Sequence, residues 1–357
     1  MNRSSHTARS KFGLLVAASL LPTLAHAQAD TEWASWALEP MPSETLVEPE
    51  GGPEFFGFLR IYDETSHGPG FVAGADPELQ ALRILQIRMG LRGQVAGTNY
   101  FITTEGATGA ITLVDAFART EITDDLGVTI GRFRAPFSFN GLLPASVLLM
   151  TRRSRQSLVW AGRDTGVMLD HSVGDRTHVF VAAQNGGDGT SDEHMLTARV
   201  EHQIAGQHRP QVGALCLDAE TDILLGVAIA DEGSVSGGQA FAADVTATWQ
   251  RWYAQAEVVG YGDGYTPGGV MGGIGARANG QGGTTPWALA SAFAIDEELE
   301  AVARYEDQDL LDTWVGTVGV NWRPQPGVRW GLHIGHQEGA GASLEGDRLD
   351  LGVTLSF

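Results

Sequence analysis

The residues best suited to chemistry lie in one segment, 135–164, whose arginines are Arg152, Arg153, Arg155 and Arg163. A guanidinium group is a planar fork of N–H donors that matches the oxygens of carboxylates and phosphates. The segment is too long for a simple connection. Its apolar stretches at 142–143 and 147–150 could pack it against a wall while the arginines line an opening, and such arginines attract anions. The alternative is an external basic loop that binds lipopolysaccharide or lies between subunits.

Sequence motifs of catalysis are missing. There is no G-x-S-x-G elbow, P-loop, H-E-x-x-H sequence or Cys/His zinc spacing. The ten histidines are scattered, and His171, His333 and His336 fall within predicted strands, where they need no catalytic role. We therefore predict that the protein is not an enzyme and uses no cofactor.

Metal and redox chemistry also have little support. Residues 185–194 contain Asp188, Asp192 and Glu193, whose oxygens could bind Ca²⁺, but their spacing does not match an EF-hand. A Gly/Asp turn is the better interpretation, so no metal site is predicted. Cys216 is the only cysteine and lies between two leucines, which indicates an apolar thiol and excludes an intramolecular disulfide.

The strands that must position these residues are clearest at the C-terminus. Apolar residues alternate with polar ones through Leu349, Leu351, Val353, Leu355 and Phe357. A period of two with one apolar and one polar face indicates a strand between two different environments. Transmembrane β-barrels have this pattern, with apolar residues toward lipid and polar residues toward a wet lumen. We predict an all-β, transmembrane, antiparallel β-barrel over residues 54–357, with Phe357 as a signal for assembly in the membrane.

The same pattern gives a count of the strands. Clear strands are predicted at 54–64, 83–96, 111–122, 126–134, 165–173, 176–184, 195–204, 239–249, 251–261, 286–295, 298–308, 313–322, 328–337 and 347–357, and weaker ones at 98–106, 210–218 and 223–231. This makes seventeen. The number must be even when both ends lie on one side of the membrane, and the alternation is inconsistent between residues 196 and 239. Sixteen strands are predicted, with fourteen and eighteen open.

Aromatic spacing and turn lengths support a membrane barrel. Trp314 and Trp322 share one strand face, eight residues apart, and Phe241 and Trp249 repeat this spacing. Eight residues span roughly 26 Å of strand. With a strand tilt of about 40° this becomes roughly 20 Å across the membrane, close to the ~25 Å between the aromatic girdles of such barrels. Short turns also alternate with long connections, as expected for the two sides of an outer membrane.

The N-terminal part resembles an export signal. A basic start, an apolar run at 12–24 and Ala25-His26-Ala27 predict a cleaved signal peptide over residues 1–27. Residues 28–53 are acidic and contain several prolines, which predicts a flexible periplasmic segment.

Charge restricts the partners. Without residues 1–27 the chain has no lysine and a net charge of about −23. Nucleic-acid binding requires a basic surface, so no nucleic acid is expected. On the predicted strands, charges that face the lumen are Arg88, Arg92, Arg119, Arg199, Arg304, Glu300 and Glu306.

The most specific stretches are GRFRAPFSFNGLLPASVLLMTRRS at 131–154 and GRDTGVML at 162–169, followed by repeats at 298–309 and 317–337. They resemble the phosphate- and polyphosphate-selective O/P porins of the bacterial outer membrane. The resemblance implies a sixteen-stranded barrel, a trimer, and an inward third external loop, here residues 135–164. We therefore expect passage of small hydrophilic solutes or ions, with anions such as phosphate as candidates. The expected partners are outer-membrane lipids, lipopolysaccharide and, because of Phe357, the barrel-assembly machinery. Such channels are rich in lysine and arginine, however, whereas this chain is acidic.

Two other functions remain open from the sequence. The first is an outer-membrane barrel enzyme, a lipid or ester hydrolase with a Ser/His pair. The second is a secreted, soluble β-sandwich that binds a ligand.

Overall fold

The computed structural model describes residues 53–68, 78–106, 110–154, 163–185, 194–206, 210–215, 219–231, 239–262, 283–309, 312–339 and 345–357. The strands are β1 (Glu54–His67), β2 (Glu78–Val95), β3 (Thr98–Glu105), β4 (Thr112–Thr123), β5 (Leu126–Arg134), β6 (Arg163–Val173), β7 (Thr177–Gln184), β8 (Met195–Ala205), β9 (Ala219–Asp231), β10 (Gln239–Gln250), β11 (Trp252–Tyr261), β12 (Trp287–Ala294), β13 (Leu299–Asp307), β14 (Trp314–Gln325), β15 (Val328–Glu338) and β16 (Gly346–Ser356). A helix, α1 (Phe139–Leu142), and a 3₁₀ turn (Ala145–Val147) follow β5. The predictions for residues 1–27, for nearly all of 28–53 and for Arg155 lie outside these ranges.

Each strand separates two environments. In β8, Thr197 and Arg199 are buried on one face, whereas Leu196 and Val200 are exposed on the other. Polar residues therefore lie inside and apolar residues outside, the reverse of a water-soluble protein. This inversion is the one expected of a barrel whose outer face is solvated by lipid. No helix within the described ranges is long and apolar enough to cross a membrane.

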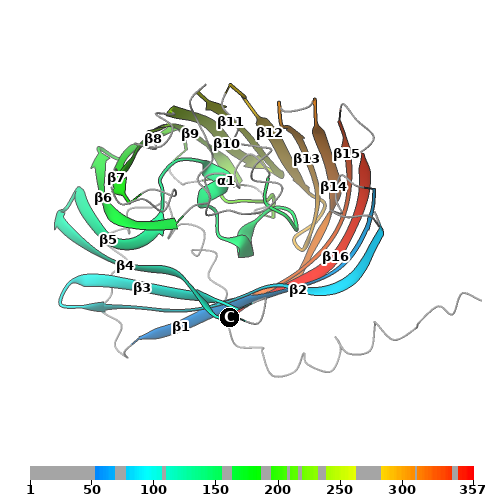
Figure 1. Cartoon of the computed structure of the whole chain (residues 1–357), viewed down its shortest axis with the longest axis horizontal. Coiled ribbons are helices and arrows are strands. Elements are labelled where there is room, and N and C mark those ends of the chain that lie inside the picture. The colour runs from blue at the N-terminus through cyan, green and yellow to red at the C-terminus, as the bar shows by residue number, and fades with distance from the viewer. Residues whose placement is uncertain are drawn as a thin grey trace, which may run out of the picture.

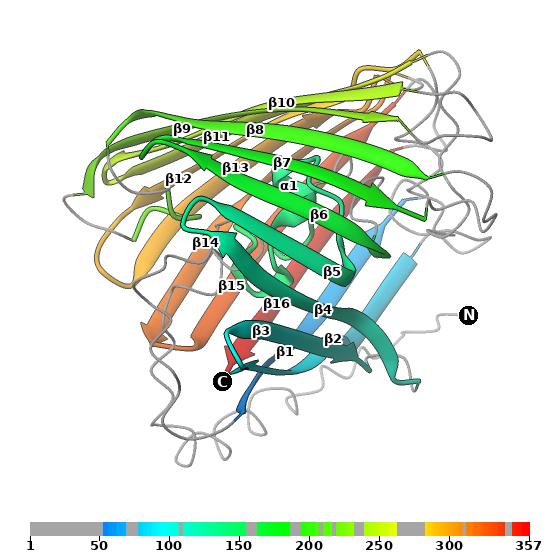
Figure 2. The ribbon, with the colours of Figure 1, turned by 90° about the vertical axis from the view of Figure 1, so that its left-hand side faces the viewer.

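The sheet closes on itself. Every strand is antiparallel to its sequence neighbours, and β1 also pairs with β16, with Tyr62 opposite Gly352. Figure 1 looks down the resulting ring, and Figure 2 shows its long inclined strands. Closure removes the free strand edges that an open sheet would expose. The closed antiparallel barrel of sixteen strands is confirmed, and a sandwich of two sheets is excluded.

The strand predicted at 210–218 is wrong. Residues 210–215, the part of it that the structure describes, form no strand, and the wall passes from β8 directly to β9. The Ala214 N–H donates to Glu300 Oε2 over 2.8 Å, and the Ala214 side chain packs in a buried cluster with Met150 and Tyr253. The apolar residues that suggested a strand instead pack inside the barrel.

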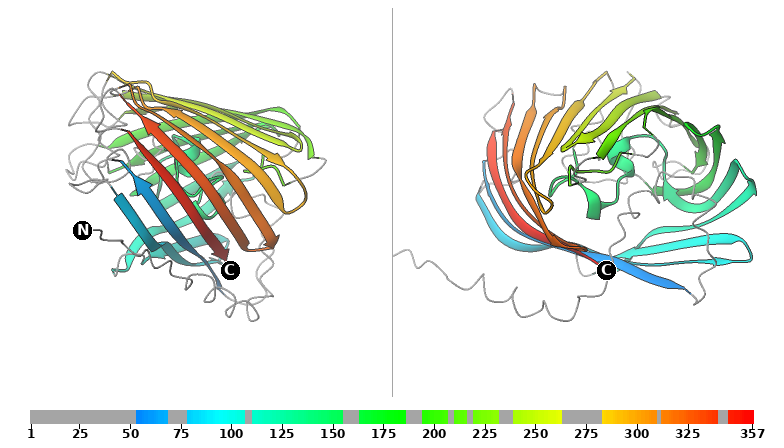
Figure 3. Two further views of the ribbon diagram at one scale, coloured as in Figure 1. Left: turned by 90° about the vertical axis from the view of Figure 1, so that its right-hand side faces the viewer. Right: turned by 180° about the vertical axis from the view of Figure 1, so that it is seen from behind.

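The two rims of the barrel differ. At one rim, which we call the terminal rim, β1 begins and β16 ends, with Phe58 of β1 opposite Ser356 of β16. Figure 3 marks the C end of the chain at this rim. Turns there include the two-residue link Ala96–Gly97, where both residues have positive φ (52° and 79°), a conformation that suits a tight hairpin. The chain passes from β1 to β2, from β5 to β6 and from β11 to β12 at the other rim, the loop rim. The terminal-rim turns between β2 and β3, β4 and β5, and β6 and β7 are short, as predicted, whereas the β8–β9 connection at the same rim, residues 206–218, is long.

Aromatic rings form two rows on the outer face between β10 and β15. Near the loop rim, Tyr305 lies between Trp287 and Trp314, with ring centroids 5.3 Å and 5.7 Å away. Near the terminal rim, Trp252 lies between Trp249 and Phe293, at 6.3 Å and 4.7 Å. Exposed residues such as Leu289 and Val318 fill the band between the rows. The outer face thus has the apolar band and the aromatic borders of a membrane barrel.

Candidate pore constriction

The chain turns into the barrel after β5. Figure 1 shows α1 inside the ring of strands. Phe137, Phe139 and Met150 are at most 2% exposed, because they pack against the inner wall and the segment 210–215. We call residues 135–154 the inward loop. It narrows the lumen between the two rims.

The first part of the inward loop is anchored by one buried carboxylate. The Ser138 hydroxyl caps α1 by accepting from the Gly141 N–H over 3.1 Å, and it donates to Glu257 Oε1 over 2.7 Å. Asn140 Nδ2 donates to the other carboxylate oxygen over 2.6 Å. A buried charge is tolerated only when hydrogen bonds replace its hydration, so β11 holds this end of the loop in one position.

The second part is bound by side chains from β1 and β13–β15. The contacts join the Leu148 carbonyl to Arg329 Nη1 (2.5 Å), the Leu149 carbonyl to Asn321 Nδ2 (2.9 Å), Thr151 Oγ1 to His333 Nδ1 (2.6 Å), the Thr151 carbonyl to Arg60, and the Arg152 carbonyl to Arg304 Nη1 (2.7 Å). Most of these donors reach backbone carbonyls. The wall therefore supplies the hydrogen bonds that an irregular backbone inside a barrel requires.

The predicted constriction arginines differ in their surroundings. Arg152 pairs with Glu64 over 2.6 Å, and Arg163 pairs with Asp115 over 2.5 Å. Arg153 instead donates to the carbonyls of Asn140 and Leu143, within the inward loop itself. Arg155 lies outside the described residues. The structure thus brings three of the four arginines to the lumen and compensates the charge of two.

Arg153 has an unusual electrostatic environment. Burial within the barrel, together with the nearby guanidinium groups of Arg163 and Arg60, lowers the pKa of Arg153 to about 9. The Glu257 carboxylate opposes this shift, but no carboxylate in the described part of the chain forms an ion pair with Arg153. Arg153 is charged at neutral pH, and its lowered pKa makes it easier to deprotonate than an exposed arginine.

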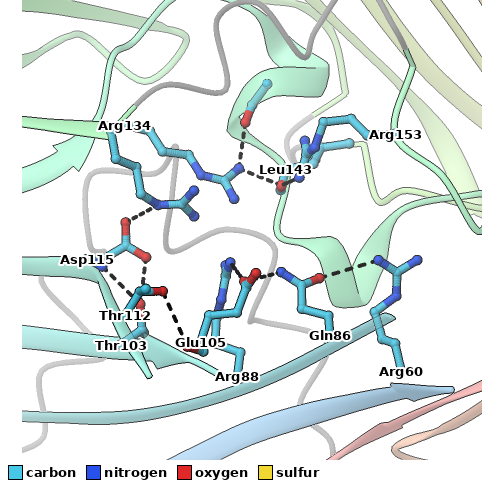
Figure 4. A network of polar contacts seen from close by, with 12 residues as sticks. Arg60, Gln86, Arg88, Thr103, Glu105, Thr112, Asp115, Arg134, Leu143 and Arg153 are labelled. Carbon is cyan, nitrogen blue, oxygen red and sulfur yellow. Dashed lines mark hydrogen bonds and ion pairs between the residues drawn. The ribbon is translucent and has the colours of Figure 1, made fainter. Parts of the chain in front are cut away.

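The charges predicted to face the lumen lie inside the barrel in local pairs. These pairs are Arg88–Glu105 (2.5 Å), Arg92–Glu54 (2.6 Å), Arg119–Asp170 (2.8 Å), Arg199–Asp244 (2.7 Å), Arg304–Glu306 and Glu300–Arg323 (3.2 Å). Figure 4 shows Arg88 and Glu105 joined to Arg60 through Gln86. Pairing cancels much of the charge of these groups, so they determine the field in the pore less than their number suggests.

The sequence analysis missed several lumen arginines, among them Arg60 and Arg323 and the two that hold the inward loop, Arg134 and Arg329. Arg134 donates to the carbonyls of Gly141 and Leu143 over 2.5 Å and 2.6 Å, and Arg329 donates to the Leu148 carbonyl. Neither pairs with a carboxylate in the residues the structure describes. Arg329 was recognisable, because it alternates with the outward Val328 and Trp330. Arg134 ends its strand, where alternation stops being informative.

A hydroxyl and an imidazole lie opposite each other on β6 and β7. Ser172 Oγ is 3.2 Å from His178 Nδ1. They share a strand face with Asp170 and Phe180, which are buried inside the barrel. The pair therefore faces the lumen, away from lipid. Within the described residues, no group of three or more His, Cys, Asp or Glu side chains could hold a metal ion.

No protein-family model matches the chain. No curated protein matches its sequence either. Similarity is found among solved structures, starting with the outer membrane channel DcaP of Acinetobacter baumannii, at 12% identity and a TM-score of 0.59 over 85% of this chain and 97% of that one. An anion-selective porin from Comamonas acidovorans has 13% identity and a TM-score of 0.58, over 86% and 99%. A triple mutant of the Rhodopseudomonas blastica porin has 11% identity and a TM-score of 0.52, over 86% and 100%.

At these identities the likeness concerns the fold. Each alignment covers nearly the whole of the other barrel. The chain therefore has the fold of bacterial outer-membrane porins. The finer resemblance to the phosphate-selective O/P porins depends on sequence motifs alone and stays a prediction.

Proposed function

We propose that the protein is a porin of the bacterial outer membrane, through which small hydrophilic solutes and ions diffuse passively. The observation that carries this proposal is the polarity of one closed wall. Its outer face is apolar between two rows of aromatic rings, and its inner face is lined with charged pairs. A wall of this kind is stable only between lipid and water.

We further propose a weak preference for anions at moderate salt. The acidic total of the chain favours cations, but charge effects fade over about 8–10 Å at physiological salt. Charged groups at the narrowest part of the pore therefore determine the ion selectivity more than distant charges do. There, Arg134, Arg153 and Arg329 bind carbonyls rather than carboxylates. Phosphate is one candidate anion.

Conductance in planar lipid bilayers tests both proposals. Purified protein should give stepwise, roughly ohmic currents in KCl. In a salt gradient, the reversal potential should indicate weak anion selectivity, which should erode at low salt as the acidic mouths become unscreened. Folded protein that gives no steps would overturn the channel proposal, and a cation-selective reversal potential at moderate salt would overturn the anion preference alone.

A hydrolase is the second candidate, because Ser172 and His178 supply a possible nucleophile and base. Their position on the lumen face disfavours a lipid substrate. Ester and phospholipid hydrolysis by the purified protein should be absent. Turnover that disappears in Ser172→Ala but persists in Ser356→Ala would instead establish the enzyme.

We also propose a homotrimer that contacts outer-membrane lipids and lipopolysaccharide and is inserted by the barrel-assembly machinery. The support is the apolar outer face and the motif resemblance. Native mass spectrometry of detergent-purified protein should give three chains, and a single chain at all concentrations would contradict the trimer.

A further inference from the structure

A chamber of about 620 Å³ lies between the inward loop and the terminal rim. Its ceiling is formed by Leu142, Pro144 and Val147 of the inward loop. Val212 and Leu215, from the segment wrongly predicted as a strand, border it as well. This volume falls within the range of small-molecule sites in proteins.

The wall of the chamber is aromatic. Six phenylalanines line it: Phe56, Phe58, Phe101, Phe117, Phe133 and Phe180. The Phe101 ring centroid lies 5.1 Å from that of Phe56 and 5.2 Å from that of Phe117, so three rings form a row across β1, β3 and β4. Phe101 and Phe117 remain partly exposed within the barrel.

Such a wall is unusual for a water-filled pore, whose inner face is expected to be polar. The neighbouring wall also leaves space for one ring of the row. A Cβ added to Gly90 would lie 2.3 Å from the Phe56 ring, so the missing side chain makes room for the ring. Aromatic faces that remain partly exposed in an enclosed space gain free energy when an apolar ligand covers them.

Positive charge borders the aromatic wall. Arg134 and Arg329 line the chamber and hold the inward loop at residues 141–143 and 148, on either side of its ceiling. Each makes its described hydrogen bonds to the loop through Nη1. The other arginines of the lining, such as Arg119, are paired with carboxylates. The lining also includes Glu297 and Glu298 at the terminal rim, and Asp115 and Asp170, whose carboxylates pair with Arg163 and Arg119.

We propose that this chamber binds small aromatic carboxylates, with the ring on the phenylalanine row and the carboxylate beside the guanidinium group of Arg134 or of Arg329. This inference rests on the proposed channel function and narrows its solute class. Stacking provides affinity for the ring, and guanidinium groups match the planar carboxylate. Simple inorganic anions can use only the second of these interactions.

The test compares three probes on the full-length purified protein. Phenylacetate contains both the aromatic ring and the carboxylate, and acetate lacks the ring. Cyclohexylacetate has a ring of similar size without an aromatic face. Phenylacetate should reduce the KCl current and bind by calorimetry about tenfold more tightly than acetate. Equal binding of phenylacetate and acetate would overturn the proposal. Equal binding of phenylacetate and cyclohexylacetate would overturn its aromatic part.

Variants test whether phenylacetate binds in the chamber. Phe101→Leu with Phe117→Leu keeps apolar volume and removes two aromatic faces, and it should weaken phenylacetate binding while KCl conductance persists. Phe241→Ala on the outer face, where the ring is 51% exposed, is the matched control and should bind as the wild type does. Unchanged affinity in the double leucine variant would place the ligand elsewhere.

The channel proposal and the chamber proposal can be refuted separately. Folded protein without KCl conductance refutes the channel, and calorimetry still decides whether the chamber binds the ring. Normal conductance with no preference for phenylacetate refutes the chamber and leaves the channel in place.

Discussion

Phe357 exchanges two backbone hydrogen bonds with Gly57. The Gly57 N–H donates to the Phe357 carbonyl over 2.8 Å, and the Phe357 N–H donates to the Gly57 carbonyl over 3.0 Å. This pairing continues the β1–β16 register beyond Phe58 and Ser356. A Cβ at Gly57 would lie 3.0 Å from the Phe357 ring, so the glycine leaves room for it. The seam that closes the barrel therefore ends on the aromatic residue predicted as the assembly signal.

Deleting Phe357 should impair assembly, because it removes both hydrogen bonds and the exposed ring at the seam. The amount of folded barrel in outer-membrane fractions, measured by its heat-modifiable migration on gels, should fall severalfold. Phe357→Trp keeps the backbone and an aromatic ring and should assemble normally. Wild-type levels of folded protein after the deletion would show that the signal lies elsewhere.

The selectivity should change at alkaline pH. Arg153, with a pKa of about 9, carries its charge below that pH and loses it above, whereas ordinary arginines stay charged. Between about pH 7 and about pH 10, anion preference should therefore decrease, and the reversal potential should shift toward cations. Arg153→Gln removes the titrating group, so the variant should start nearer to cation selectivity and change less over this range. A shift of equal size in the variant would assign the titration to another group.

Glu257 should control the width of the pore. Glu257→Ala leaves Ser138 and Asn140 without their shared acceptor, at a cost of about 1–3 kcal/mol for the lost hydrogen bonds. We expect a lower unfolding temperature, larger single-channel conductance and more current noise as the inward loop loosens. Asp175→Asn, at an exposed turn on the terminal rim, is the matched control and should leave all three unchanged. Unaltered conductance in Glu257→Ala would show that this end of the loop does not limit the current.

Arg134 and Arg329 should set the sign of selectivity together. Replacing both by Gln removes two charges that lack a carboxylate partner in the described residues, so the reversal potential should shift toward cations. The Lys double variant preserves the charge but not the guanidinium fork, and it should remain close to the wild type. Arg251→Gln, at an exposed turn, controls for a general loss of positive charge. A reversal potential unaffected by the Gln variant would remove both groups from the ion path.

The polarity of individual strands was readable from the sequence. Alternation along β16 and β13 reports directly which residues share a face, because successive side chains of a strand point in opposite directions. The requirement for an even number of strands then corrected the count to sixteen, although it did not show that 210–218 was the extra segment. That stretch is apolar because it packs on Met150 and Tyr253, which are distant in sequence.

What the sequence determined by itself was the two-faced wall, because side-chain alternation depends only on neighbours along the chain. Tertiary structure alone decided which charges cancel and which remain. Arg163 and Asp115 are 48 residues apart, and Thr151 and His333 are 182 apart. Such contacts depend on the register of every strand between them and on the closure at Gly57 and Phe357. The arginine-bordered aromatic chamber likewise depends on tertiary structure, because its inward loop and its phenylalanine row come from separate parts of the chain.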